Sequence, residues 1–289
     1  MVKFYNKAFW EELRKKWNLP IPKTYPEFRE VVLRSAELGK YETPLAYGLA
    51  ERGIRSWSTV HTGYLTAFSS YGQRDLSPDL SAAINTPEGV EITKIWVEML
   101  QKAGDPGWTN YTWYDARQNF SAGKFYAITE ADYQAVIYEN PMQSQIAGKI
   151  GYALPPAGPA GTIKSNMWTW SLGMSTFSKH KEAAWLFLMW ATAPGTMLEA
   201  TLKFGNYNPT RRSIWQHSQV VEKTAKWGAK PGQYREIVEA MYTKYGEVAW
   251  TPNPDVTTLG DIWAEASRQA YGGKAVKQAL DEAAQKINA

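Results

Sequence analysis

The residues of this sequence that could most readily do chemistry are tryptophans and tyrosines. The chain carries 14 Trp and 17 Tyr against 9 Phe. Trp and Tyr present an apolar ring beside a hydrogen-bonding group, which suits a surface that must be both apolar and wet. Sugars and polyols are ligands of this kind, because their C–H groups stack on indole while their hydroxyls need directional partners. The bias indicates carbohydrate binding, with core packing as the alternative for many of these rings.

Several short segments bring such rings together with amide, carboxylate or guanidinium groups. Trp168 and Trp170 are two residues apart, so a strand would point both to one face. Together the segments supply stacking faces and hydrogen-bonding groups without a nucleophile–base pair, which is typical of a binding cleft. Their candidate residues are Trp57, Asp132, Tyr133, Trp168, Trp170, Asn206, Asn208 and Arg211.

Carboxylates give the main alternative. Asp115, Glu130 and Asp132 lie near predicted strand ends, and a pair of carboxylates flanking a sugar is what a glycoside hydrolase needs. Carboxylates also accept hydrogen bonds from sugar hydroxyls, and their spacing does not separate the two roles. The three histidines are isolated, so packing is favoured over metal ligation. The sequence contains no glycine-rich phosphate loop and no Gly-x-Ser-x-Gly motif, and we expect no cofactor.

Composition narrows the class of protein. Of 289 residues, 44% are hydrophobic and 21% charged, as in a soluble globular protein. The net charge of +4 comes from scattered residues, which argues against nucleic-acid binding. There is no cysteine, and the chain as given begins without a signal-peptide pattern. The longest apolar run, 183–191, is too short to cross a bilayer and predicts a buried helix.

Helices and short strands alternate along the chain, which predicts the α/β class. Asn6 is a candidate helix cap, and Thr24 with Glu27 forms a candidate capping box. The predicted helices cover about 7–17, 25–38, 58–68, 87–103, 114–122, 181–192 and 195–204, with further helices after 218. The predicted strands are 44–48, 125–128, 150–154 and 171–177.

Five motifs, in order along the chain, resemble the bacterial extracellular solute-binding proteins, the maltose-binding-protein-like sugar family. No single motif would suffice, but five spread over most of the chain make a chance match improbable. They are Tyr5-Asn6-Lys7 with Pro22-Lys23-Thr24-Tyr25-Pro26-Glu27, Phe120-Ser121-Ala122-Gly123-Lys124, Gly148 to Pro159, Ser178-Lys179-His180-Lys181-Glu182-Ala183-Ala184-Trp185, and the Gly205…Pro209-Thr210-Arg211 turn.

The resemblance implies a periplasmic-binding-protein-like (type II) fold of two α/β lobes that close on a sugar or polyol. Residues 1–168 and 219–289 would form the C-terminal lobe, and residues 169–218 a returning remnant of the N-terminal lobe. The protein would serve an ABC-transporter permease from the periplasm or outside the cell, without catalysis, metal or direct membrane insertion. The implied ligand contacts are Trp57, Asp132, Tyr133, Trp168, Trp170, Asn206, Asn208, Arg211 and, in the late helix, Trp263.

The front of the chain departs from the family. Relatives carry a first segment of the N-terminal lobe before the stretch that resembles Tyr5-Asn6-Lys7, so we expect that segment to be absent here. The helix at 181–192 would then lack its sheet, and its apolar face would be exposed unless the missing segment or a swapped copy covers it. A split-protein fragment made for reassembly therefore stays open as a second alternative.

Overall fold

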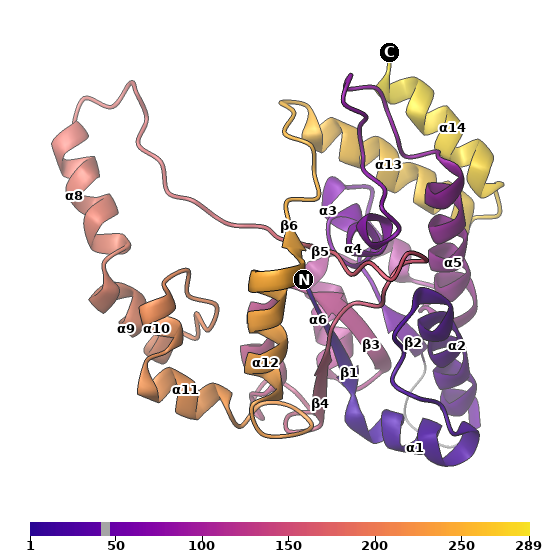
Figure 1. Cartoon of the computed structure of the whole chain (residues 1–289), viewed down its shortest axis with the longest axis horizontal. Coiled ribbons are helices and arrows are strands. Elements are labelled where there is room, and N and C mark those ends of the chain that lie inside the picture. Colours follow the sequence, from indigo (N-terminus) through magenta and orange to yellow (C-terminus); the bar gives the residue numbers. More distant parts are fainter. Residues whose placement is uncertain (42–46) are drawn as a thin grey trace.

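A four-stranded mixed sheet forms the centre of the computed structural model, which describes residues 1–41 and 47–289 (Figure 1). Its strand order is β2-β3-β1-β4. β1 (Val2–Asn6) runs antiparallel to both β3 (Phe125–Glu130) and β4 (Ile150–Ala153), whereas β2 (Tyr47–Ala50) runs parallel to β3. β2 begins inside the predicted strand 44–48, of which 44–46 lie outside the described residues.

β1 is buried along its whole length, and the sequence analysis did not predict it. Its side chains alternate between the two faces of the sheet. Val2 and Phe4 join one hydrophobic cluster and Tyr5 joins the other. Lys3 is also buried: its Nζ donates to Thr129 Oγ1 at 3.2 Å and lies 3.3 Å from the centre of the Phe28 ring. A lysine in the middle of the strand masks the pattern of a central strand.

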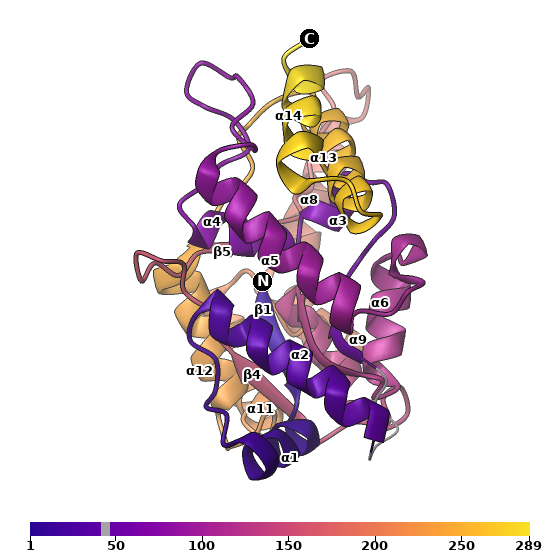
Figure 2. The ribbon, with the colours of Figure 1, turned by 90° about the vertical axis from the view of Figure 1, so that its right-hand side faces the viewer.

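Two helices on the Tyr5 face begin where the sequence predicts. Asn6 Oδ1 accepts a hydrogen bond from Ala8 N at 3.1 Å, and Glu27 Oε2 accepts one from Thr24 N at 3.2 Å. Figure 2 shows α2 and α5 crossing this face, with α13 and α14 at one end. The helices of this layer are α1 (Lys7–Trp17), α2 (Tyr25–Tyr41), α4 (Gly63–Ser70), α5 (Pro87–Ala103), α13 (Val256–Tyr271) and α14 (Val276–Ile287).

Aromatic rings fill the layer on the other face. The rings of Phe4 and Tyr138 lie edge to face at 4.9 Å, and Tyr138 packs in the same way on Phe120. Tyr152 of β4 contacts Tyr234, whose side chain is fully buried. The helices here are α6 (Trp113–Ser121), α7 (Ala135–Tyr138), α9 (Pro194–Phe204), α10 (Arg212–Trp215), α11 (Ser218–Thr224) and α12 (Gln233–Ala240).

Short elements connect the layers. β5 (Ser165–Asn166) and β6 (Gly246–Glu247) pair in parallel, away from the main sheet. The predicted strand 171–177 is wrong, because these residues have no strand partner and their side chains are exposed. The predicted helix 58–68 is divided into α3 (Trp57–Val60) and α4 by a turn at His61 and Thr62. The remaining short helices are η1 (Trp108–Asn110), η2 (Asp132–Gln134) and η3 (Met241–Tyr245).

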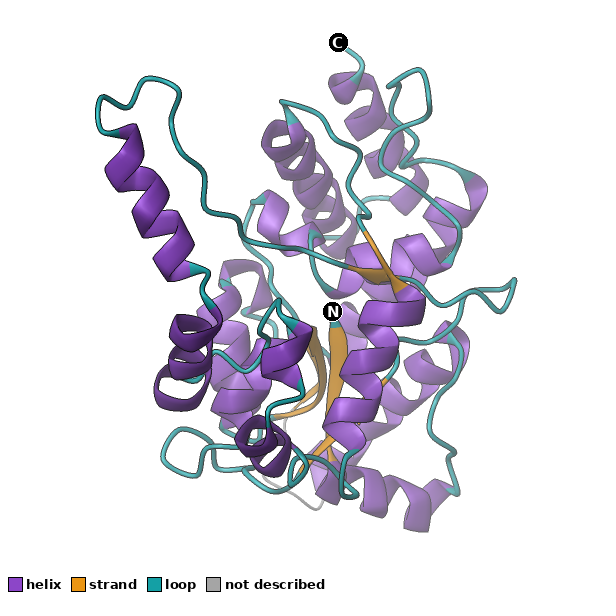
Figure 3. Ribbon diagram, turned by 60° about the vertical axis from the view of Figure 1, so that its left-hand side comes forward, coloured by secondary structure: helices purple, strands orange, loops and turns teal. Residues whose placement is uncertain are grey.

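A segment that we call the arm, residues 169–193, leaves the body of the molecule and carries α8 (Lys181–Ala191) (Figures 1 and 3). α8 forms where the sequence predicts it, but it contains no buried residue, so the expectation of a buried helix is not met in this chain. The large apolar side chains exposed on α8 are Trp185, Leu186, Phe187, Met189 and Trp190. No described helix is long and apolar enough to span a membrane.

Trp263 requires a correction, because it lies in the core and not in a ligand site. Its side chain is 0% exposed, and its ring packs edge to face on Phe68 at 4.7 Å. Its indole Nε1 donates to the hydroxyl of Tyr64 at 3.2 Å, so its polar atom is already paired. The spacing of α13 placed Trp263 correctly on a helix but did not show which face that helix buries.

We expect Trp263→Ala to lower the free energy of unfolding by about 3–5 kcal/mol, because truncating a fully buried aromatic ring leaves a cavity. Trp170→Ala is the matched control: that side chain is 84% exposed, and its loss should change the free energy of unfolding little. Urea denaturation of both variants measures the difference. Equal effects would mean that Trp263 is not a core residue.

Candidate functional site

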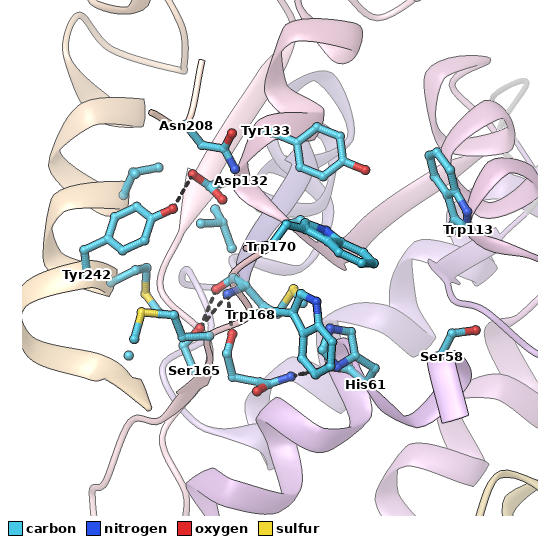
Figure 4. Close-up of a pocket in the computed structure, with 18 of the residues that line it drawn as sticks. Ser58, His61, Trp113, Asp132, Tyr133, Ser165, Trp168, Trp170, Asn208 and Tyr242 are labelled. Carbon is cyan, nitrogen blue, oxygen red and sulfur yellow. Dashed lines mark hydrogen bonds between the residues drawn. The ribbon is translucent and has the colours of Figure 1, made fainter. Parts of the chain in front are cut away.

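A pocket of about 450 Å³ lies where the parallel strands β2 and β3 end (Figure 4). The carboxyl ends of neighbouring parallel strands meet at one edge of a sheet, which is where open α/β sheets bind ligands. Here that edge is completed by α3, by the segment after β5 and by η3. Its lining includes Arg52, Ser56, Trp57, Ser58, His61, Trp113, Asp132, Tyr133, Asn166, Trp168, Trp170, Asn208, Met241 and Tyr242.

One wall of the pocket is aromatic. The ring centres of Trp57 and Trp168 are 5.4 Å apart with an angle of 32° between the planes. Trp170 lies 6.2 Å from Trp168 and nearly perpendicular to it, and His61 contacts Trp168 edge to face at 4.6 Å. Trp168 is 40% exposed, so it offers ring surface to a ligand. Trp168 and Trp170 both line the pocket, although neither lies in a β-strand.

The place of Trp57 is set by α3 and α13. Ser56 caps α3 by accepting a hydrogen bond from Ser58 N. The backbone N of Trp57 donates to Asp261 Oδ1 at 2.7 Å. A Cβ on Gly260 would lie 2.4 Å from Trp57 Cβ, so only glycine permits this approach of the two helices. Gly260 and Asp261 therefore position an aromatic ring more than 200 residues earlier in the chain.

The opposite wall is polar and centres on Asp132. Its Oδ2 accepts a hydrogen bond from the hydroxyl of Tyr242 at 3.1 Å, and Asn208 also donates to this carboxylate. Burial raises the pKa of Asp132 above its ordinary value, while the nearby amino terminus and these two hydrogen bonds act in the opposite direction. Figure 4 shows Asp132, Asn208 and Tyr242 grouped on one side of the pocket, across from the indoles. Aromatic faces and a hydrogen-bond acceptor thus face one space.

A buried ion pair supports the floor between the two walls. Arg52 donates to both carboxylate oxygens of Glu130, from Nε at 2.6 Å and from Nη2 at 2.7 Å. The Glu130 side chain is 1% exposed and the Arg52 side chain 11%. Arg52 Nη1 also reaches the carbonyl oxygen of Ser58 at 3.4 Å. The pair therefore ties the ends of β2 and β3 to α3.

The structure brings six of the nine predicted residues together around this pocket. They are Trp57, Asp132, Tyr133, Trp168, Trp170 and Asn208. Arg211 is not among the lining residues; its exposed side chain donates to the carbonyl oxygen of Thr192. Asn206 is exposed beside it, outside the pocket, and Trp263 is in the core. The structure thus places six of the predicted residues at one pocket and three outside it, and ligand contact by the six stays a prediction.

The pocket residues that were not predicted include Arg52, His61, Trp113 and Tyr242. Arg52 follows a strand that ends at the same edge as β3, so the edge rule could have identified it. His61 lies in the turn after α3 and Tyr242 in η3, and the position of each depends on distant contacts; the histidine was assigned only to packing. Trp113 starts α6, where its ring stacks on Tyr114 with 3.6 Å between ring centres.

The carboxylates do not form the pair that a glycoside hydrolase requires. Glu130 is held by Arg52, and Asp115 accepts two hydrogen bonds from Thr112 in a capping box. Among the described residues that line the pocket, Asp132 alone is acidic. No group of His, Asp and Glu in residues 1–41 and 47–289 could hold a metal ion. The arrangement is suited to stacking and hydrogen bonding.

We expect Asp132→Asn to raise the free energy of unfolding at pH 7. With a raised folded-state pKa, wild-type stability is highest below the ordinary carboxyl pKa and is lost as the pH rises through the folded pKa. The neutral amide removes this loss, so the difference between variant and wild type should vanish on acidification. Asp115→Asn is the control with the opposite sign, because hydrogen bonds from Thr112 lower the pKa of Asp115. Denaturant unfolding from pH 4 to pH 7 measures both; equal signs would contradict the assignment.

Comparison with known proteins identifies the family. Residues 1–198 match the family model of the bacterial extracellular solute-binding proteins. The erythritol/L-threitol-binding protein of Mycolicibacterium smegmatis is 30% identical over 273 residues, a match that covers 93% of this chain and 54% of that protein. A probable ABC transporter-binding protein of Deinococcus radiodurans is 24% identical over 245 residues, covering 82% of this chain and 57% of that protein. The chain thus spans about half the length of these curated relatives.

A solved structure of the same fold agrees. The solute-binding protein of Agrobacterium radiobacter K84, in complex with ribitol, matches with a TM-score of 0.83 at 22% identity. The match covers 99% of this chain and 68% of that one, and the fold is the type II periplasmic-binding-protein fold that the five sequence motifs predict. The family match over 198 of 289 residues confirms the resemblance, and this chain belongs to the bacterial extracellular solute-binding protein family.

Proposed function

We propose that this protein binds a small sugar or polyol, with acyclic polyols preferred, and presents it to an ABC-transporter permease in the periplasm or outside the cell. The observation that carries the proposal is the pocket in which the rings of Trp57, Trp168 and Trp170 face the single carboxylate of Asp132. The names of the matched relatives, which mention erythritol, L-threitol and ribitol, support an acyclic ligand.

Each wall has a distinct role in this proposal. The exposed face of Trp168 stacks on the C–H groups of the ligand, a contact that indoles make well. Asp132 accepts hydrogen bonds from ligand hydroxyls, and Asn208 and Tyr242 hold the carboxylate in place for it. A ligand without hydroxyls would leave the half-buried carboxylate short of partners, which is costly. The walls together select a molecule that is apolar on one side and polyhydroxylated on the other.

Closure follows from where the indoles lie. Trp168 and Trp170 stand at the root of the arm, so a movement of the arm relative to the body would change the aromatic wall. We infer that the ligand favours a closed arrangement in which both walls contact it. A ligand shifts such an equilibrium only by its difference in affinity for the two states. The protein has no need of catalytic groups for this task, and we propose that it is not an enzyme.

Calorimetric titration of erythritol, ribitol, mannitol and small sugars into this chain tests the proposal. We expect binding of at least one polyol. Asp132→Ala should weaken it by about 1 kcal/mol or more, because ligand hydroxyls lose their acceptor, and Trp168→Ala should weaken it by loss of the stacking face.

Trp185→Ala on α8 is the control, since that ring is outside the pocket. The same titrations are repeated after mixing the chain with the part of the M. smegmatis relative that lies outside the match. If neither sample binds any polyol or sugar, the proposed ligand class is wrong. Release of a hydrolysis product from an oligosaccharide would instead favour the hydrolase.

We further propose that the apolar face of α8 is covered by other polypeptide, either an N-terminal lobe segment or a swapped copy of this chain. The motivating observation is the exposure of five large apolar side chains on one helix of eleven residues. Patches of this kind mark interaction surfaces. That the matched relatives are nearly twice as long is in keeping with an additional lobe segment.

The expected result is that this chain self-associates, or forms a stable complex with the unmatched part of the M. smegmatis relative. Leu186→Asp combined with Trp190→Asp should abolish either association, because both changes place charge on the apolar face. Lys203→Asp on α9, where Lys203 is exposed, is the charge-matched control. Sedimentation equilibrium gives the mass in each case. If the chain has the mass of a monomer at every concentration and forms no complex with the added segment, this proposal is wrong.

A further inference from the structure

His61 stands at the junction of the pocket with the β5–β6 connection, and the proposed binding contacts do not yet include it. It follows α3, its side chain is 5% exposed, and it lines the pocket beside Trp168 (Figure 4). Its Nδ1 lies 3.1 Å from the indole Nε1 of Trp250 and 3.2 Å from Nδ2 of Asn166. Two nitrogen atoms that carry hydrogen, one from an indole and one from an amide, thus lie within hydrogen-bond distance of Nδ1.

These contacts fix which nitrogen of the ring carries the proton. An indole N–H can only donate, so Nδ1 must accept the bond from Trp250 and cannot itself be protonated. The orientation of the Asn166 amide agrees: its Nδ2 also donates to the carbonyl oxygen of His61 at 2.7 Å, and its Oδ1 accepts from Ala249 N. A neutral ring with Nδ1 as acceptor carries its proton on Nε2.

The ring stays neutral over the physiological range. Burial lowers the pKa of His61 to about 3, and the nearby positive charge of Arg52 acts in the same direction. Protonation would also place a hydrogen on Nδ1, against the indole N–H of Trp250. The Nε2–H group is therefore a donor whose presence does not depend on pH near neutrality.

Two other polar side chains at the pocket already have hydrogen-bond partners. Arg52 is bound to Glu130 and to the carbonyl oxygen of Ser58, and Tyr242 donates to Asp132. Nε2 of His61, by contrast, has no hydrogen-bond partner within the described part of the chain. Its ring is nearly perpendicular to those of Trp168 and Trp57, with ring centres 4.6 Å and 5.2 Å apart, so the imidazole lies against the aromatic wall of the pocket that it lines.

We propose that His61 is a specificity-determining residue of this pocket: its imidazole holds the indoles of Trp57 and Trp168 in place and donates its Nε2–H to one hydroxyl oxygen of the ligand. This inference rests on the proposed function. A donor of fixed direction, set between two stacking rings, distinguishes a ligand with a hydroxyl at that carbon from its deoxy analogue or epimer. Sites built to bond a hydroxyl reject analogues that lack it, because the protein group is then left unpaired.

Two measurements on the full chain test the role. The first is nitrogen NMR of the histidine side chains in the ligand-free protein from pH 5.5 to pH 8. We expect His61 to show a protonated Nε2, an unprotonated Nδ1 and no titration. Addition of a polyol that binds should shift the Nε2–H signal. A protonated Nδ1, a titration in this range, or an Nε2–H signal that saturating polyol leaves unchanged would overturn the proposal.

The second measurement compares the polyol affinity of two variants, each of which replaces only one of the two ring nitrogens of His61. The amide of His61→Asn can reach the place of Nδ1 and accept from Trp250, but it leaves the Nε2 position empty. The amide of His61→Gln can reach the Nε2 position and donate there. We expect His61→Asn to weaken polyol binding at least tenfold and His61→Gln to weaken it less. We also expect His61→Asn to show a smaller preference than the wild type for the hydroxylated ligand over its deoxy analogue. His180→Asn, on the exposed arm, is the control.

The outcomes separate the two levels of inference. If the wild-type chain binds a polyol and His61→Asn binds it equally well, the role of His61 is overturned and the proposed function stands. If the wild-type chain binds no sugar or polyol, with or without the added segment, the proposed function falls and this role falls with it. The NMR measurement needs no variant to fold, so it decides the tautomer in either case.

Discussion

The buried ion pair between Arg52 and Glu130 is the interaction from which the pocket is built. It joins the last residue of β3 to the second residue after β2, and it extends to α3 through the carbonyl oxygen of Ser58. A buried pair of this kind adds little net stability, but loss of one partner leaves an uncompensated charge that costs about 3–5 kcal/mol. Its contribution is to fix geometry. Because the ion pair holds the ends of β2 and β3 at a set distance, it also fixes where the loops that follow these strands begin.

The two walls of the pocket depend on that fixed edge in different ways. Asp132 is the second residue after β3, so the end of that strand sets its position. Trp57 depends on helix packing, because Gly260 and Asp261 of α13 decide how closely α3 approaches. The aromatic wall is therefore held by helix packing, whereas the polar wall starts at the end of β3 and is completed by Asn208 and Tyr242 from distant parts of the chain. Under the proposed function, variation of the aromatic wall would change the size of ligand accepted without disturbing the carboxylate proposed to accept hydrogen bonds from ligand hydroxyls.

The sequence predicted most clearly the features that are set by neighbouring residues. Helix starts at Asn6 and Thr24 follow from capping chemistry, and the edge position of Asp132 follows from the end of an apolar strand. β1 was missed because Lys3 interrupts its apolar pattern, and only the folded chain supplies the Thr129 hydroxyl and Phe28 ring that accommodate it. Trp263 was misplaced, and the contacts of His61 were not foreseen, for a related reason. Their roles are decided by residues between 100 and 200 positions away, which no spacing rule reveals.

α8 is a second case in which the sequence alone does not show the surroundings of an element. Its sequence is apolar nearly all round, a pattern that in soluble proteins belongs to buried helices, yet none of its residues is buried. The local signal is therefore strong and the expected partner surface is not supplied by the rest of this chain. Trp170, 84% exposed, stands at the root of the same arm and lines the pocket. Any surface that covers α8 would restrict the movement of the arm. Trp168 and Trp170 would then lose less conformational entropy when a ligand binds, because they would already be partly ordered. Covering α8 and binding a ligand are in this way expected to favour each other.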